Sequence, residues 1–410
     1  MGEKYKTKEF TPSLSRMLMA GANREQPIYR WFVYPHSFTK EFVHWAVQQL
    51  GLTRGDRVLE PFLGAGTTLL ACKELSIVAT GFDILPLSIL ISNVKVGNYR
   101  LQTLRQQWSL LKKQSWSTRR RNQIPDIPIL SKAFDADVLE RIFAIEECVR
   151  EIENTKYSNF FLVGLLNTIG QLSKAEKGGG WLRLCPDKVV LPEEVDTLFS
   201  NSVEKMLSDL ESPRYRGPER NWQAYLGDAR NLPNNGEFDA TISSPPYLNR
   251  HDYTRIFSLE LAVAFLKTHK QLKELRYRSL RSHVEAKKSF DVQGYSIPSR
   301  LAEVLESLED APLNNDRILS MVAGYFEDLY GVLKGLYPHI KRGGHVVFVL
   351  GNVRFGGVAI PVDEIVAQIG EQAEFEWRKT VVGRLRGNSA QQMGRFGKDP
   401  SPESVIIWSK

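Results

Sequence analysis

The amino-acid sequence predicts an α/β fold with one seven-stranded sheet and a mainly α-helical insertion. Short apolar runs that read as buried strands alternate with amphipathic helical segments along most of the 410 residues. A glycine-rich turn follows one of these strands and a Pro-Pro turn follows another, which places both turns at the carboxyl edge of one parallel sheet. The chain closes on two strands with no helical pattern between them, which indicates an antiparallel pair.

Seven segments have the length and apolar content of strands: 57–60, 78–82, 222–226, 238–243, 343–350, 375–384 and 403–409. Turn-forming or polar residues bound most of them. Apolar residues at helical spacing predict helices at 40–50, 87–96, 101–113 and 315–337. These helices can cover the sheet, so the segments account for one complete α/β domain.

The chain divides into three regions. Residues 1–30 show weak periodicity and are expected to form an arm that wraps the body or stays mobile. Residues 31–114 and 216–410 supply the sheet domain. The sheet does not need 115–215, where helical spacing recurs over 138–152 and 157–172. We expect a helical subdomain there, with target recognition as a candidate role.

Composition limits the class of protein. The hydrophobic content of 42% supports a real core, and 54 Lys and Arg against 47 Asp and Glu favour polyanionic partners moderately. Cys72, Cys148 and Cys185 have neither paired nor metal-like spacing, so we expect a cytoplasmic protein without a metal site. The first residues are charged where a signal peptide is apolar, and no apolar run is long enough to cross a bilayer, so no membrane partner is expected.

The glycine-rich turn predicts a nucleotide cofactor that has no pyrophosphate. Its glycines permit a tight turn and let an adenosyl group approach the backbone of the next helix. Leu69 stands where a dinucleotide motif has its third glycine. The following strand ends in Asp83, 23 residues after Glu60, where a carboxylate can bridge ribose hydroxyls or simply cap a helix. The candidate cofactor residues of this part of the chain are Glu60, Phe62, Gly64, Gly66 and Asp83.

The tetrapeptide Ser244-Pro245-Pro246-Tyr247, called the clamp below, has the chemistry to hold a planar amino group. The Ser244 hydroxyl and a proline carbonyl can each accept a hydrogen bond from such an amine. These acceptors favour the pyramidal geometry that frees the amine's lone pair for attack. The prolines hold the backbone rigidly, and Tyr247 offers a stacking face worth about 1–3 kcal/mol. The structural alternative is an ordinary turn after a strand.

In this order, the two motifs resemble those of the S-adenosylmethionine-dependent DNA methyltransferases that modify exocyclic base nitrogens. The resemblance covers about 35–110 and 220–410. It implies a Rossmann-like methyltransferase sheet, S-adenosylmethionine as cofactor, double-stranded DNA as substrate and a cognate restriction endonuclease as candidate partner. It also implies that Asp228 binds the adenine amino group of the cofactor and that Phe38 and Thr39 contact its methionine end. Thr39 is equally a candidate N-cap of the next helix.

Serine at the first clamp position resembles the enzymes that methylate N4 of cytosine, and N6 of adenine is the alternative. Methylation at C5 of cytosine requires a cysteine nucleophile after a proline, and the chain has no Pro-Cys dipeptide. We therefore expect direct transfer to the amine of a base flipped out of the duplex. Methylation of RNA or of a protein glutamine, and a binding module without catalysis, are the rival functions. The clamp serine disfavours the first rival, and the intact motifs disfavour the second.

Three segments are candidates for DNA contact. A basic stretch follows the clamp and can bind phosphates, although such runs also form solvated helix faces. Its members are Lys267, Lys270, Lys273, Arg276, Arg278 and Arg281. The glycine-rich loop 174–183 carries Trp181, which can fill the gap left by a flipped base or simply anchor the loop. The loop 384–398 carries Arg384 and Arg386, which suit guanine readout or any polar loop.

Overall fold

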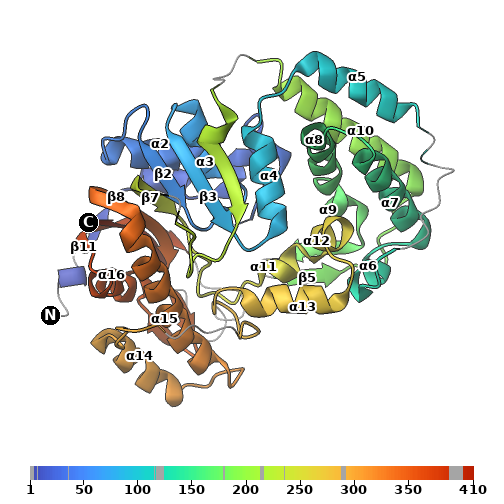
Figure 1. The fold of residues 1–410 in the computed structure, drawn as a ribbon. Helices are drawn as coiled ribbons and strands as arrows, with labels where there is room; N and C mark the ends of the chain where they lie inside the picture. The colour runs from blue at the N-terminus through green and yellow to red at the C-terminus, as the bar shows by residue number, and fades with distance from the viewer. Residues whose placement is uncertain are drawn as a thin grey trace.

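A computed structural model of the protein describes residues 4–6, 8–35, 37–114, 116, 124–178, 181–212, 217–234, 236–287, 292–386 and 400–410. A mixed sheet of eight strands runs through the molecule, in the order β1-β11-β12-β8-β7-β2-β3-β6 (Figure 1). The neighbours from β8 to β6 are parallel, whereas β12 is antiparallel to both β8 and β11. The predicted α/β class with a mainly parallel sheet is therefore confirmed.

All seven predicted strands form. They are β2 (Arg57–Glu60), β3 (Val78–Asp83), β6 (Trp222–Leu226), β7 (Phe238–Ser243), β8 (Ile340–Gly351), β11 (Glu376–Arg386) and β12 (Ser401–Ser409). Because β2, β3, β6 and β7 are parallel, their carboxyl ends share one edge of the sheet. The glycine turn and the clamp both begin at that edge, as expected.

The predicted number of strands is one short, because the N-terminal region adds β1 (Lys8–Phe10) beside β11. Helix α1 (Leu14–Met17) then lies on β11, and the side chains of Leu14 and Leu18 are buried. A Cβ on Gly383 of β11 would lie 2.5 Å from Cδ1 of Leu18, so this contact is very close. The described part of the N-terminal region therefore packs against the edge of the sheet formed by β11.

Helices cover both faces of the sheet. One face carries α2 (Lys40–Gln49), α3 (Thr67–Glu74) and α4 (Pro86–Val96), and the other carries α15 (Ile318–Leu336) and α16 (Val362–Gln372). Successive strand residues enter opposite buried clusters: Val58 and Val347 belong to the first, Leu59 and Val346 to the second. This alternation explains why the apolar strands are continuous runs in the sequence.

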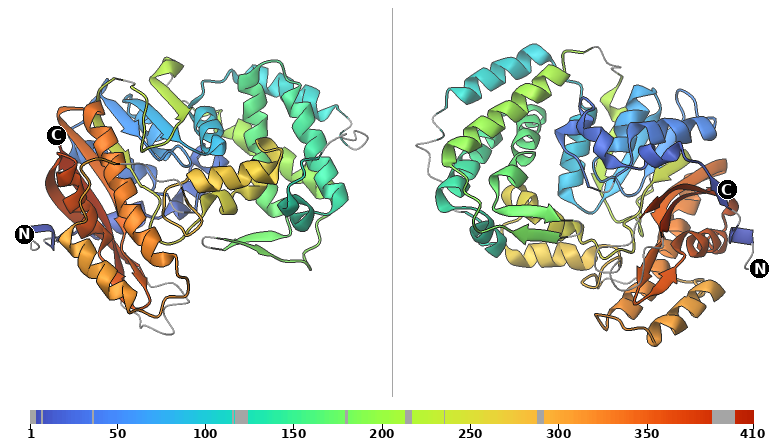
Figure 2. Two further views of the ribbon diagram at one scale, coloured as in Figure 1. Left: turned by 60° about the horizontal axis from the view of Figure 1, so that its bottom comes forward. Right: turned by 180° about the vertical axis from the view of Figure 1, so that it is seen from behind.

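The predicted insertion is mainly helical. Its elements and the preceding helix are α5 (Leu101–Lys112), α6 (Pro128–Ala133), α7 (Ala136–Arg150), α8 (Thr155–Leu166), α9 (Ile169–Leu172), β4 (Ala175–Gly178), β5 (Trp181–Leu184) and α10 (Pro192–Asp209). The single helix predicted over 157–172 is divided between α8 and α9. The segment after it, predicted as a loop, forms the β4–β5 hairpin. This hairpin extends away from the helices in Figure 2.

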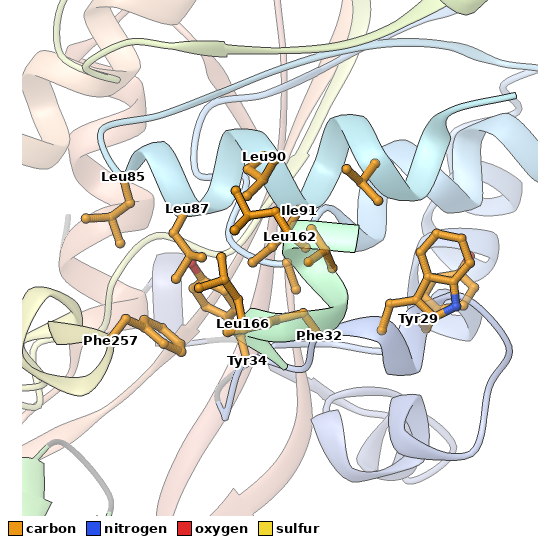
Figure 3. Packing of buried hydrophobic residues seen from close by; sticks show 14 of the residues in the cluster. Tyr29, Phe32, Tyr34, Leu85, Leu87, Leu90, Ile91, Leu162, Leu166 and Phe257 are labelled. Carbon is orange, nitrogen blue, oxygen red and sulfur yellow. The ribbon is translucent and has the colours of Figure 1, made fainter. Parts of the chain in front are cut away.

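The helices of the insertion share a core with the sheet domain. Figure 3 shows Leu87 and Ile91 of α4 beside Leu162 and Leu166 of α8, with Tyr34 among them. All five side chains are buried in one continuous cluster. The insertion is therefore packed against the sheet domain through an apolar contact.

The chain after the clamp forms α11 (Tyr253–Ile256), α12 (Ser258–Ala264), α13 (His269–Arg278) and α14 (Ser299–Glu309). A small hairpin, β9 (Val353–Phe355) and β10 (Val358–Ile360), follows β8. Among the described residues, no helix is long and apolar enough to cross a membrane. The same residues contain no cluster of three or more His, Cys, Asp or Glu side chains that could hold a metal ion.

Candidate active site

Glu60, the last residue of β2, holds the glycine turn that connects β2 to α3. The buried carboxyl group of Glu60 is hydrogen-bonded to the backbone N–H of Phe62 (3.0 Å), to Oγ1 of Thr68 (2.7 Å) and to the hydroxyl of Ser243. Burial penalises the charged carboxylate and raises the pKa of Glu60 to about 8. Glu60 also lines the cavity described below, although its oxygens bind groups of the chain itself.

Both glycines of the turn have left-handed backbone conformations, with φ of +49° at Gly64 and +73° at Gly66. A Cβ on Gly66 would lie 2.4 Å from Oγ of Ser92, so no larger residue fits between α3 and α4. The N–H of Gly64 donates to Oδ2 of Asp83 (2.9 Å). The turn is therefore fixed to the end of the neighbouring strand β3.

Two aspartates follow successive strands, as predicted. Asp83 ends β3 and also accepts a hydrogen bond from the N–H of Leu85 (2.9 Å), and burial raises its pKa. Asp228 follows β6, and both of its oxygens pair with Arg230, at 3.0 Å from Nε and 2.9 Å from Nη2. Arg230 in turn pairs with the buried Asp328 on α15 at 3.0 Å.

These strand ends enclose a first cavity. The glycine turn and residues 83–85 and 227–230 form one wall, and the chain after the clamp forms the other. Most of the predicted cofactor residues line it with their own atoms, and Gly66 lies in the turn between lining residues 65 and 67. Those that line it are Phe38, Glu60, Phe62, Gly64, Asp83 and Asp228. Ser244 and Pro246 of the clamp reach the same cavity.

Thr39 lies directly before α2. It occupies the N-cap position of α2, but its side chain makes no capping hydrogen bond. The residue is buried and lines neither cavity of the site. Its backbone N–H instead donates to the carbonyl of Met17, so Thr39 ties the N-terminal region to α2.

The clamp is held in place by β8 and α15. The hydroxyl of Ser244 donates to the carbonyl of Val349 on β8 (3.3 Å), and Oη of Tyr325 donates to the carbonyl of Pro246 (3.0 Å). Because the Ser244 hydrogen points at β8, the oxygen lone pairs are left to accept a further hydrogen bond. Pro245 is buried and lines neither cavity.

A second cavity opens on the other side of the clamp, over the ends of β8, β11 and β12. It shares Ser37, Phe38 and Ser244 with the first cavity. Its remaining lining residues are Leu18, Met19, Gly21, Pro35, Tyr247, Val349, Arg384 and Glu403. The N-terminal region therefore contributes to the site, which its weak sequence pattern did not predict.

Charged side chains lie at one end of the second cavity. Glu403 on β12 is 3% exposed and pairs with Nε of Arg384, while Nη1 of Arg386 lies 3.7 Å from its other oxygen. The guanidinium of Arg386 also lies over the ring of Tyr247, 5.2 Å from its centre. A Cβ on Gly351 would lie 2.4 Å from Nη2 of Arg386, so a larger residue here would displace the guanidinium. Burial, followed by the charge of Glu403, raises the pKa of Tyr247.

Sequence reasoning missed Ser37 and Glu403. The hydroxyl of Ser37 is buried where the two cavities meet, and it has no hydrogen-bond partner among the described residues. The sequence shows a serine beside Phe38, but it does not indicate that the hydroxyl of this serine is buried without a hydrogen-bond partner. Glu403 looked like an ordinary strand residue, and only the pairing of β12 with β11 reveals its arginine partner.

The predicted basic stretch is divided between two environments. Lys267, Lys270 and Lys273 are exposed at the start of α13 and just before it, and Arg278 is exposed at the rim of the first cavity. Two arginines have internal partners instead. Arg276 pairs with Asp252 (2.7 Å), and Arg281 pairs with Glu327 (2.8 Å) and Asp328 (2.7 Å). These two ion-paired arginines therefore fix the segment after the clamp to its neighbours.

The remaining predicted DNA contacts are described in part. Arg384 lines the second cavity, and Arg386 lies over the ring of Tyr247 in the clamp. Trp181 begins β5, but its side chain lies outside the described part of the structure, as do residues 179–180 of the same loop and residues 387–398 of the loop between the last two strands.

Comparison with known proteins identifies the family. Type II methyltransferase M.BsoBI from Geobacillus stearothermophilus is 31% identical in an alignment that covers 98% of this chain and 89% of that protein. The chain belongs to the type II DNA methyltransferases of restriction-modification systems. The resemblance on which the sequence prediction rests is confirmed at this level. The comparison leaves open which base the type II methyltransferase modifies.

Two further relatives are also type II methyltransferases. Type II methyltransferase M.AvaI from Nostoc sp. is 28% identical over 97% of this chain and 90% of that protein, and type II methyltransferase M.MvaI from Kocuria varians is 20% identical over 85% and 82%. No family model matches the chain. Among solved structures, TrmN from Thermus thermophilus overlaps with 93% of this chain and 49% of that one, at a TM-score of 0.30 and 10% identity.

A DNA methyltransferase requires a methyl donor, and the first cavity fits S-adenosylmethionine. Gly64 brings its backbone to the wall of the cavity without a side chain, and Asp83 offers a carboxyl group at the strand end next to it. The unpaired hydroxyl of Ser37 faces the junction with the second cavity. This combination of glycine backbone, acid and hydroxyl suits an adenosyl group that carries an amino acid.

Proposed function

We propose that this type II DNA methyltransferase transfers a methyl group from S-adenosylmethionine to the exocyclic N4 of a cytosine that has been flipped out of double-stranded DNA. One observation carries the proposal: two cavities meet at Ser244. A cofactor in the first cavity and a base in the second would bring their reacting atoms together beside Ser244, where the two cavities meet. Neither cavity alone would require a hydroxyl at that junction.

The direction of the Ser244 hydroxyl supports the role of an acceptor. Its hydrogen is donated to the carbonyl of Val349, so its lone pairs can accept a hydrogen bond from the target amine. A proline carbonyl of the clamp accepts from the second hydrogen of the amine. The lone pair of the amine is then directed at the methyl carbon, because delocalisation into the ring is reduced when the nitrogen becomes pyramidal.

The first cavity holds the methyl donor. Asp83 suits the ribose hydroxyls, Asp228 the adenine amino group, and Ser37 with Phe38 the methionine end. The bound cofactor supplies an electrophilic methyl group. The amine becomes acidic once methylated, so it can release its proton to water without a strong base on the protein.

The second cavity is proposed to receive the base. Tyr247 presents a ring for stacking, a contact worth about 1–3 kcal/mol. The guanidinium of Arg386 now covers this ring, and it would share or vacate that face when a base enters. Extrusion of the base costs a few kcal/mol, which the stacking and the hydrogen bonds at the clamp offset.

The surface beside the site is proposed to bind the DNA backbone. Lys267, Lys270 and Lys273 form an exposed group on and just before α13, and Arg278, at the end of the same helix, lines the first cavity. Phosphate binding by such lysines supplies affinity without sequence information. A cognate restriction endonuclease that reads the same site is the proposed partner, as in restriction-modification systems generally.

Product analysis tests the proposed function. The protein is incubated with S-adenosylmethionine and unmethylated duplex DNA, and the DNA is digested to nucleosides and analysed by mass spectrometry. N4-methylcytosine is the expected product. N6-methyladenine, or methylation of RNA or protein in place of DNA, would overturn the assignment.

A further inference from the structure

The second cavity contains an arginine whose donors match one edge of cytosine. We propose that Arg384, held by Glu403, binds the N3 and O2 atoms of the flipped base and thereby selects cytosine over adenine. The inference rests on the proposed function, because it assumes that the base lies in the second cavity with its amine at Ser244.

A β-bulge directs Arg384 at its partner. Val382 on β11 is opposite Ser404, and Arg384 is opposite the adjacent residue Glu403, so Gly383 is an additional residue in the strand. A bulge changes the direction of the side chains that follow it and is common beside active sites. Leu18 lies so close to Gly383 that a Cβ there would come within 2.5 Å of its Cδ1. The bulge is therefore fixed by the N-terminal region.

The ion pair with Glu403 orients the guanidinium. Nε of Arg384 donates to one oxygen of Glu403, and Nη1 of Arg386 lies 3.7 Å from the other oxygen. The carboxylate is nearly buried, and the Arg384 side chain is 24% exposed. Among the described residues, Glu403 is the one partner of Arg384, which leaves the Nη groups of Arg384 available as donors.

The positions of Ser244 and Arg384 in the sheet suit a pyrimidine between them. Ser244 follows β7 and contacts Val349 on β8, whereas Gly351 of β8 is opposite Glu403 of β12, which is opposite Arg384 of β11. The two residues thus lie at one end of the sheet, three strand spacings apart, or about 14 Å. An arginine side chain and a pyrimidine ring together can bridge such a separation. Both residues line the same cavity.

The chemistry of the base edges explains the selectivity. Beside its amine, cytosine presents two adjacent acceptors, N3 and O2, which a guanidinium can bind with two parallel hydrogen bonds. Adenine presents the acceptor N1 beside its amine, followed by a C–H group. One N–H of a largely buried guanidinium would then face carbon, and a site with an unmatched polar group discriminates strongly. Glu403 offers acceptors, so it cannot replace the arginine in this role.

The test compares Arg384→Ala and Arg384→Lys with the wild-type protein on three duplexes that differ at the target position alone: cytosine, 3-deazacytosine or adenine. The Lys variant keeps the charge beside Glu403 but lacks the planar fork. Arg378→Ala is the matched control, since Arg378 is on the same strand but pairs with Ser409 (2.7 Å) and Glu376 (2.9 Å) away from the cavity. Cofactor affinity, measured by calorimetry, reports that each variant is folded.

We expect both Arg384 variants to bind the cofactor normally, to lose about 10- to 100-fold in kcat/KM on cytosine, and to lose most of the preference for cytosine over adenine. Replacing cytosine by 3-deazacytosine, which lacks N3 as an acceptor, should slow the wild type and the Arg378→Ala control but should not slow Arg384→Ala further.

Two failures are distinguishable. If the wild type produces N4-methylcytosine and the Arg384 variants keep its base preference and its sensitivity to 3-deazacytosine, the role of Arg384 is refuted and the proposed function stands. If the wild type does not methylate N4 of cytosine, the proposed function itself fails, and the role of Arg384 fails with it.

Discussion

The buried carboxyl group of Glu60 is hydrogen-bonded to the hydroxyl of Ser243, and this contact joins the ends of β2 and β7. Glu60 begins the glycine turn, and Ser243 directly precedes the clamp. One hydrogen bond therefore links the segment that cradles the cofactor in our proposal to the segment that holds the amine. A shift of about 1 Å between two such segments can cost about 100-fold in rate.

The first prediction concerns the pH dependence of stability. Burial raises the pKa of Glu60 from 4.5 to about 8, so between these values the folded state holds a proton that the unfolded state has lost. The free energy of unfolding must then fall as the pH rises through this range. The Glu60→Gln variant has no such proton. Between pH 5 and pH 8 it should gain stability relative to wild type, on the order of 3 kcal/mol.

Urea unfolding at several pH values measures this difference. Glu193→Gln, the same substitution at an exposed residue on α10, is the control and should not reproduce the gain of the Glu60→Gln variant. If the Glu60→Gln variant followed the wild-type pH profile throughout, the carboxylate would be ionised in the folded protein and our account of the turn would be wrong.

The second prediction concerns catalysis. Ser244→Ala removes an acceptor that serves the amine while it is being methylated, so kcat should fall by about 100-fold or more. The affinity for S-adenosylmethionine should change by less than about threefold, because the cradle formed by Gly64, Gly66 and Asp83 is intact. Single-turnover methyl transfer and calorimetry measure the two quantities.

Ser307→Ala, on the exposed surface of α14, is the matched control and should behave as wild type. Ser244→Ala activity within threefold of wild type would exclude the hydroxyl from the reaction. A parallel loss of cofactor affinity would assign Ser244 to cofactor binding in place of the amine.

The third prediction concerns DNA affinity. Replacing Lys267, Lys270 and Lys273 together with Gln should reduce the dependence of log K on log salt by about 0.9 for each phosphate that a lysine no longer neutralises, up to about 2.7. The decrease in affinity should be similar for specific and random duplexes, because phosphates carry no sequence information. Fluorescence anisotropy at four salt concentrations measures the slope.

A triple variant at Lys334, Lys341 and Lys379 removes the same charge from lysines that each pair with a carboxylate elsewhere on the protein. Its slope should equal that of wild type. Equal slopes for the two triple variants would remove α13 from the interface.

The parts of the site that could be predicted lie in short continuous segments of the sequence. The glycine turn and the clamp are continuous segments, and the strands before them are apolar runs with clear ends, so Asp83, Asp228 and Ser244 could be placed at one sheet edge before the structure was known. The position of each of these three residues follows from the end of the strand that precedes it. No knowledge of strand order is required.

The second cavity could not be predicted, because its walls meet only through tertiary pairing. Met19, Val349 and Glu403 belong to three remote segments, and the bulge at Gly383 has no signature beyond a glycine in a strand. The internal ion pairs of two arginines in the basic stretch could not be predicted for a related reason. Charge can be counted in the sequence, whereas the partners that occupy Arg276 and Arg281 are acids brought close by folding.

The last prediction separates the position of the clamp from its chemistry. Oη of the buried Tyr325 donates to the carbonyl of Pro246, so it orients the clamp without touching either substrate in our proposal. Tyr325→Phe should lower kcat by about five- to tenfold and the free energy of unfolding by about 1 kcal/mol, while the KM for DNA and the cofactor affinity stay nearly unchanged.

The matched control is Tyr330→Phe on the same helix, whose hydroxyl donates to the carbonyl of Gln293 (3.4 Å), a residue outside both cavities. It should show a similar loss of stability with no change in kcat. If both variants lost kcat equally, Tyr325 would act through the general stability of α15. If Tyr325→Phe kept full kcat, the position of the clamp would depend on its prolines and on Val349, and the hydroxyl of Tyr325 would have no part in it.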